Sequence, residues 1–320
     1  MAEAADDDVL GKILTRLDVK ELIRCKSVCK SWYSFITCPR FINRHLNLSY
    51  NEDRDDSEHS GRRIFLVQKY YCGYIPYVLV GSSNGLVCLI SYHLSQVLVC
   101  NPWTREVRQL NPPPFSMKTR LFKWGFGYDS STDDYKVIVG TGRRKNTRLQ
   151  MLSLKSNTWS FVMDVKYTFM TVIGFLCNGA LHWLVEDEEN ERKFIIAYNL
   201  AKNEFTEIQL PNDERYGSRY TCPGVINGYL CMHQWNPHRV WVMKKYNVTE
   251  SWELLPQPLE LQPLIIHYMK ASPDIVPHES LVHSSAACFL KENLPEFICS
   301  HTFVRSLVSP MLMEAEAAHE

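Results

Sequence analysis

Hydrophobic residues near the N-terminus recur at the spacing of a single helical face. They stand one, four and five residues apart along the chain, at Val9, Leu10, Ile13, Leu14 and Leu17. Asp18 then occupies the position of a helix N-cap, and Glu21 three residues later can complete a capping box. The pattern predicts one helix before Asp18 and a second helix after it.

Apolar residues continue through two further stretches. The second helix carries Leu22 and Ile23. A third segment carries Val28, Cys29, Trp32, Phe35 and Ile36, before Pro39 ends or restarts the helix. A three-helix module of about forty residues has too little interior for a self-sufficient core. We therefore expect its apolar faces to need a partner.

The pattern changes after Leu48. Residues 51–63, NEDRDDSEHSGRR, are polar and charged, which is typical of a linker. Helical periodicity is then replaced by short β-rich runs, at residues 77–80, 86–90, 96–99, 135–139, 181–185 and 240–242. The second domain is predicted to be all-β.

A repeat organises this second domain. Asn-Gly dipeptides stand at residues 84–85, 178–179 and 227–228, each before an apolar run, as is favoured in type I′ hairpins. Their separations are 94 and 49 residues, and 94 is close to twice a repeat of about 47. The turn missing from this series falls near residue 131, where Ser130–Asp133 precede the apolar run Tyr135–Val139.

A second marker keeps the same interval. Predicted turns at Thr104, Asn157, Asn203 and Thr249 precede short strands led by Val107, Trp159, Phe205 and Trp252. Four strands in about 47 residues is typical of a β-propeller blade. We count four clear blades between Tyr77 and Leu255 and a degraded fifth between Leu264 and Phe303. No strands can be assigned from Pro256 to Glu279.

The ring can close if the run Ile64–Lys69 pairs with a C-terminal strand such as Phe297–Val304, which would cover the sheet edges. Five or six blades follow from this count. The kelch double-glycine signature is absent, so the architecture is kelch-like without kelch motifs. A β-sandwich with accidental spacing is the alternative.

Composition narrows the classes of function that the chain can have. The 320 residues are 45% hydrophobic and 12% aromatic, enough for a substantial core. Net charge is zero, from 35 basic and 35 acidic residues, so no overall field favours nucleic acid or a membrane. No secretory signal or spanning run of ~20 apolar residues is visible. The eleven cysteines lack framework spacing and are expected to be reduced, in the cytoplasm, the nucleus or both.

Candidate catalytic chemistry is weak throughout. The carboxylates of Asp187–Glu191 lie in one charged run, which favours a solvated loop. Cys231, His233 and His238 lack the second ligand pair of a metal site. His182 beside Trp183 favours a core residue, and Arg143–Lys145 a basic hairpin tip. No nucleophile elbow, phosphate loop or dinucleotide fingerprint occurs. We predict no catalytic residue, no metal and no cofactor.

The N-terminal module resembles the plant F-box, through Ile13-Leu14, Arg16-Leu17, Leu22, Arg24 and Val28–Trp32. Three further motifs resemble those of plant F-box proteins with an F-box-associated domain: Asn101–Thr104 (NPWT), Gly125–Asp129 (GFGYD) and His301–Pro310 (HTFVRSLVSP). Two Leu-Pro dipeptides common in that family are replaced by Ala5-Asp6 and Leu17-Asp18. Aspartate is a good N-cap, so the helices remain possible.

The resemblance implies an α+β multidomain chain: an F-box at 1–48, a linker at 49–63, a propeller-like domain at 64–310 and a tail at 311–320. It also implies a substrate receptor of a cullin-RING (SCF) ubiquitin ligase, whose partners are a Skp adaptor and, through it, cullin and RING subunits. The predicted adaptor-binding residues are Val9, Leu10, Ile13, Leu14, Leu17, Leu22, Ile23, Val28, Cys29 and Trp32.

Loop length predicts where the β domain binds its target. If each blade is a four-stranded meander, the tight turns share one face and the long, variable loops share the other, where recognition usually resides. The candidates for binding an unknown protein target are Tyr216, Arg219, Tyr220, Trp235, His238 and Arg239. Two alternatives stay open: a propeller lectin or hydrolase with an incidental helical N-terminus, and an F-box protein acting outside the ligase.

Overall fold

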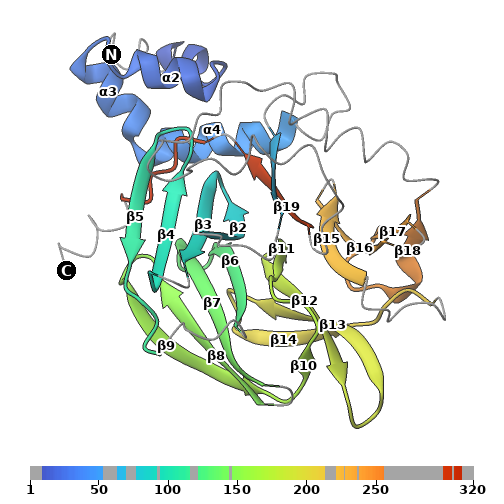
Figure 1. The fold of residues 1–320 in the computed structure, drawn as a ribbon. Coiled ribbons are helices and arrows are strands. Elements are labelled where there is room, and N and C mark those ends of the chain that lie inside the picture. Colours follow the sequence, from blue (N-terminus) through green and yellow to red (C-terminus); the bar gives the residue numbers. More distant parts are fainter. Residues whose placement is uncertain are drawn as a thin grey trace.

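Helices form the N-terminal part of the chain and antiparallel sheets form the rest (Figure 1). The computed structural model describes residues 9–52, 63–69, 77–91, 94–115, 122–143, 146–212, 221–226, 228–235, 238–255, 298–304 and 306–311. Its helices are residues 9–14, α2 (Val19–Cys25), α3 (Lys30–Thr37), α4 (Pro39–Glu52) and the short 3-10 helix η1 (Thr249–Ser251). Within these ranges, no helix is both long and apolar enough to cross a membrane.

The N-terminal module has four helical segments instead of the predicted three. Asp18 caps α2 as predicted, because its carboxylate accepts a hydrogen bond of 2.9 Å from the Glu21 N–H. Pro39 restarts the chain as α4, since a proline at the first helical position lacks an N–H that would be unpaired there. Helix α4 continues to Glu52, beyond the boundary predicted at residue 48. Its buried face consists of Phe41, Ile42, His45, Leu46 and Ser49.

Four sheets of consecutive antiparallel strands make the blades of a propeller. Their inner strands contact one another around a common centre (Figure 1). The first blade is β2 (Val78–Ser83), β3 (Leu86–Ser91), β4 (Gln96–Asn101) and β5 (Glu106–Leu110); the second is β6 (Lys123–Asp129), β7 (Asp134–Arg143), β8 (Asn146–Ser153) and β9 (Thr158–Val165). The third is β10 (Thr168–Phe169), β11 (Phe175–Cys177), β12 (Ala180–Asp187), β13 (Arg192–Asn199) and β14 (Glu204–Ile208); the fourth is β15 (Thr221–Ile226), β16 (Tyr229–Trp235), β17 (His238–Met243) and β18 (Trp252–Leu254).

The described residues thus form four blades, not the five or six predicted. A further sheet has only two strands, β1 (Arg63–Lys69) and β19 (Ile298–Val304), which pair antiparallel from Arg63 opposite Val304 to Lys69 opposite Ile298. This pairing of distant segments confirms the predicted partnership of residues 64–69 with a C-terminal strand. The predicted fifth blade contributes only β19 here, because residues 256–297 lie outside the described ranges. Four separate antiparallel sheets, three with four strands and one with five, also replace the alternative of two stacked sheets.

The described turns confirm both repeat markers, and Asn227 of the third Asn-Gly dipeptide lies outside the described residues. A type I′ hairpin needs positive φ at both central residues, and φ is 51° at Asn84 and 82° at Gly85, then 47° at Asn178 and 72° at Gly179. The turn expected near residue 131 connects β6 to β7. The second marker corresponds to the turn before each outermost strand, which has positive φ at Arg105, Asn157, Asn203 and Asn247.

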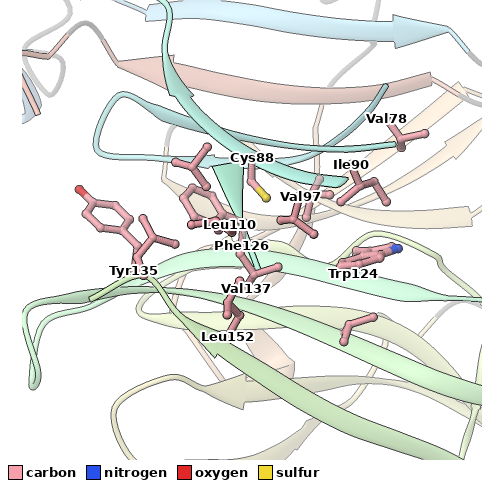
Figure 2. Close-up of a cluster of buried hydrophobic side chains, with 14 of the residues drawn as sticks. Val78, Cys88, Ile90, Val97, Leu110, Trp124, Phe126, Tyr135, Val137 and Leu152 are labelled. Carbon is pink, nitrogen blue, oxygen red and sulfur yellow. The ribbon is translucent and has the colours of Figure 1, made fainter. Parts of the chain in front are cut away.

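The hydrophobic core lies between neighbouring blades. Figure 2 shows the cluster between the first two blades, where Val97 and Ile90 of one blade face Trp124 and Val137 of the next. Similar clusters lie between the second and third blades and between the third and fourth. A blade with a neighbour on each side thus has both of its faces buried, which explains why its strands are continuous apolar runs.

The motif Gly125–Asp129 shows why such close packing requires these residues. A Cβ on Gly125 would lie 2.7 Å from Leu181 Cδ1 and 2.9 Å from Trp183 Cζ2, so only glycine lets the third blade approach. Side chains alternate along a strand, and Phe126 accordingly points to the opposite side, into the core shared with the first blade (Figure 2).

A buried ion pair ends this motif. Lys136 Nζ lies 2.5 Å from Asp129 Oδ2 and donates to the Leu200 carbonyl at 2.9 Å, which connects the second blade to the third. Burial opposes ionisation of Asp129, but hydrogen bonds from Lys136, Ser131 and Thr132 outweigh it. The pKa of Asp129 is therefore held below its ordinary value.

Candidate functional site

The predicted adaptor-binding residues divide into interior and surface groups. Leu14 and Leu22 are fully buried in a cluster with Val19 and Ile36, so they support the surface without being part of it. Leu10, Leu17, Ile23 and Trp32 are partly buried against that cluster. The exposed members are Val9 at 55%, Ile13 at 55%, Val28 at 62%, and Cys29. These side chains offer apolar surface to a partner.

Tyr33 is a surface residue that the sequence interpretation missed. It is 55% exposed on α3, directly after the half-buried Trp32. One feature of the sequence indicates this exposure, which is that Tyr33 is a large aromatic residue outside the apolar face of its helix. The exposed apolar surface of the module therefore includes Tyr33 together with Val9, Ile13 and Val28.

Part of the partner expected for the module comes from the chain itself. Leu307 is 2% exposed and belongs to the same cluster as Leu14 and Leu22. Trp103 and Val308 also contact this cluster, and each is shared with a cluster of the first blade. The module is therefore attached to the propeller through apolar packing.

The helices sit on the tight-turn face of the first blade (Figure 1). Tyr50 of α4 donates a hydrogen bond of 3.0 Å to Asn84 Oδ1 in the β2–β3 turn. Burial lowers the pKa of Lys26, and the Glu106 carboxylate at the start of β5 opposes that effect, so the two groups interact electrostatically across the junction. Because strands alternate in direction, the β3–β4, β7–β8, β12–β13 and β16–β17 connections lie at the other end of the blades.

The predicted target-binding residues are only partly within the described ranges. Tyr216, Arg219 and Tyr220 lie outside them. Trp235 ends β16 and His238 begins β17, and these two residues are paired across the hairpin. Arg239 follows on β17 and is half-buried. The backbone therefore places all three at the β16–β17 connection. This connection lies at the end of the blade opposite to the tight turns, here called the loop face, as the meander pattern predicts.

The residues considered for chemistry have structural roles. The carboxylate of Asp187 accepts hydrogen bonds from the Glu189 N–H at 3.1 Å and from Asn190 Nδ2 at 2.7 Å, which makes the acidic run a capped turn. Cys231 is buried in β16, and Arg143 pairs with Asn146 at the end of a hairpin. Among the described residues, no group of three or more potential ligands is placed to hold a metal ion.

His182 is a core residue whose hydrogen bonds define its tautomer. It is fully buried, and its Nδ1 lies 3.1 Å from the Phe175 carbonyl oxygen, which can only accept. Nδ1 therefore carries the proton, and Nε2 accepts from the Tyr246 hydroxyl at 2.9 Å. Burial lowers the pKa of His182 from 6.5 to about 4, so the ring is neutral at pH 7.

This burial predicts a pH dependence of stability. Between pH 6.5 and about 4 the unfolded chain binds a proton at His182 that the native protein does not, so stability falls as the pH drops through this window. The expected loss is roughly 3 kcal/mol. Urea unfolding at a series of pH values should show a shallower slope for His182→Asn, which keeps the donor to Phe175. Tyr246→Phe, which keeps the imidazole, should retain the wild-type slope. Equal slopes in His182→Asn and wild type would contradict the assignment.

Comparison with known proteins agrees with this architecture. The F-box associated beta propeller domain family matches residues 40–303, and the F-box domain family matches residues 6–44. The F-box protein CPR1 of Arabidopsis thaliana is 28% identical, with 77% of this chain and 70% of that protein covered. An F-box/kelch-repeat protein of the same plant is 26% identical, with 78% of each chain covered. The chain therefore belongs to the family of F-box proteins that carry an F-box associated β-propeller domain.

Proposed function

We propose that this protein is a substrate receptor of an SCF-type ubiquitin ligase, which docks on a Skp adaptor through its F-box and captures a target protein with its propeller. The observation that carries the proposal is an F-box whose Val9, Ile13, Val28 and Tyr33 are exposed and which is joined by apolar packing to a propeller domain. The chain itself would perform no chemistry. Its contribution would be proximity, because holding a target beside a ubiquitin-charged enzyme raises its effective concentration there.

The arrangement of the two domains favours target capture at the loop face. The helices cover tight turns of the first blade through Tyr50 and Trp103, so the opposite ends of the blades lie away from the helices on which the adaptor would dock. A target bound there would lie at the opposite end of the blades from the F-box. The seven cysteines whose side chains the structure describes are free, which supports a reducing compartment such as the cytoplasm or nucleus.

The proposal is tested by co-purification from plant cells in which degradation is blocked. A Skp adaptor and a cullin should be recovered with the chain, and mass spectrometry of the same sample should identify the target. Recovery of the adaptor without a cullin would place the protein outside the ligase. Recovery of neither would overturn the proposal.

The loop-face assignment predicts a specific loss of target capture. Replacing Trp235 and Arg239 together with alanine should weaken target capture at least tenfold, since aromatic and arginine side chains contribute most to binding at interfaces. Adaptor binding, measured in the same pull-down, should be unchanged. The matched control replaces Lys155 and Lys202, which lie in tight turns between β8 and β9 and between β13 and β14. Equal damage from the control would refute the assignment.

A further inference from the structure

A segment distant in sequence completes the F-box. After β19 the chain returns to the helices, and residues 306–310, here called the C-terminal segment, lie between them and the first blade (Figure 1). Leu307 is buried with Leu14, Leu22 and Ile36 of the F-box. Its neighbour Val308 contacts this cluster and the core between the first two blades. The C-terminal segment therefore belongs to both domains.

Asn101, the last residue of β4, holds the C-terminal segment. Its side chain is fully buried, and Nδ2 donates to the carbonyl oxygens of Ser306 at 2.9 Å and Val308 at 2.8 Å. Its Oδ1 accepts from the backbone N–H groups of Trp103 at 2.9 Å and Thr104 at 3.4 Å. One amide thus joins the C-terminal segment to the β4–β5 turn, whose Trp103 packs on the F-box.

Two other contacts fasten the same junction. Ser306 Oγ donates to the Asn84 carbonyl at 2.6 Å, and the side chain of that asparagine accepts from Tyr50 of α4 at 3.0 Å. At the far end of the segment, Arg108 Nη1 donates to the Pro310 carbonyl at 3.3 Å. Buried polar contacts of this kind have strict geometry, so they oppose rotation of one domain against the other.

We infer that the C-terminal segment fixes the orientation of the F-box relative to the propeller, and that Asn101 is the positioning residue of this junction. A fixed orientation would set the direction in which a captured target faces the ligase, on which proximity depends. That consequence rests on the proposed function, whereas the junction can be tested on the chain alone.

The experiment changes the donor group of the Asn101 side chain into an acceptor and keeps its oxygen. Asn101→Asp keeps an oxygen that can accept from Trp103 and Thr104, but it places a carboxylate oxygen against the carbonyls of Ser306 and Val308. The matched control is Asn199→Asp, because Asn199 ends β13 in the same way that Asn101 ends β4. Its Oδ1 accepts from the N–H groups of Ala201 at 3.0 Å and Lys202 at 2.9 Å in the β13–β14 turn of the third blade. Among the described residues, Asn199 has no hydrogen bond to the C-terminal segment.

Pulsed electron spin resonance would measure the distance between spin labels at Ser34 on α3 and Phe161 on β9, both exposed. The labels should be carried by non-natural residues, since the chain has native cysteines. Wild type and Asn199→Asp should give one narrow distance distribution, and Asn101→Asp a distribution at least twice as wide with unchanged circular dichroism. A distribution as narrow in Asn101→Asp as in wild type would overturn the inference.

If Asn101→Asp does not fold, Ser306→Ala decides the question with a smaller change, because it removes one hydroxyl that donates to the Asn84 carbonyl and accepts from the Val308 N–H at 3.2 Å. It should widen the same distribution, and a width equal to wild type would overturn the inference. Adaptor pull-down with the unlabelled variants separates the two proposals. If the wild-type chain does not bind the adaptor, the proposed ligase function is contradicted. The inference about the junction is unaffected by that result.

Discussion

Replacing Ile13 and Val28 together with aspartate is expected to weaken adaptor binding at least 100-fold while leaving the protein folded. The two side chains are 55% and 62% exposed, so carboxylates at these positions remain solvated in the free chain. In a complex they would be buried against apolar surface without a partner, which costs several kcal/mol. A 100-fold loss corresponds to about 2.7 kcal/mol.

Calorimetric titration with a purified Skp adaptor would measure this loss, and circular dichroism would confirm the fold. Phe161→Asp is the matched control, because Phe161 is 57% exposed but lies on β9 of the second blade. It should bind normally. Leu14→Asp is uninformative here, since Leu14 is fully buried and the change should unfold the module. Wild-type affinity in the double variant would mean that the adaptor does not bind this surface.

Replacing Asp129 with asparagine is expected to lower the free energy of unfolding by about 3–5 kcal/mol, because a buried Lys136 ammonium would lose its counterion. Lys136→Met in the same background should recover part of the loss, since no uncompensated charge would then be buried. Urea denaturation of the single and double variants measures the coupling. Additive losses would show that the two groups are not energetically paired.

The neighbouring Asp133 provides the control. Its carboxylate side chain is 63% exposed and lies 3.7 Å from Lys155, so Asp133→Asn should cost less than about 1 kcal/mol. The pH gives a second check. Since the pKa of Asp129 is lowered, its contribution is present above the unfolded value of about 4 and is lost as the pH falls through the lower native pKa. The Asp129→Asn protein should lack that acid loss.

Local signals in the sequence were reliable where the structure depends on a few adjacent residues. The Asp18 cap, the Asn84-Gly85 and Asn178-Gly179 hairpins and the turn near residue 131 are confirmed, because capping and positive φ are decided by the residues themselves. The blade interval follows from these turns. The pairing of β1 with β19 was also predicted, since ring closure requires partners for two otherwise unpaired strands.

The division of the F-box between interior and surface could not be read from periodicity. Leu14 and Ile13 are adjacent apolar residues, yet one is fully buried and the other is 55% exposed. Helical spacing shows which side chains share a face, but not which of them a distant segment will cover. Leu307 packs in the same cluster as Leu14, and nothing near either residue in the sequence indicates that arrangement.

The order of the domains, the meander within each blade and the tight turns could therefore be predicted from the amino-acid sequence, because each depends on interactions between close neighbours along the chain. Only the tertiary structure decided which F-box side chains face solvent, and where the buried Asp129–Lys136 pair and the Asn101 junction form. The Asn101 junction joins residues 205 and 207 positions apart, and Lys136 of the buried pair also donates to the carbonyl of Leu200 in the next blade. Their stability comes from desolvation and from hydrogen-bond geometry that exist only after the blades have packed.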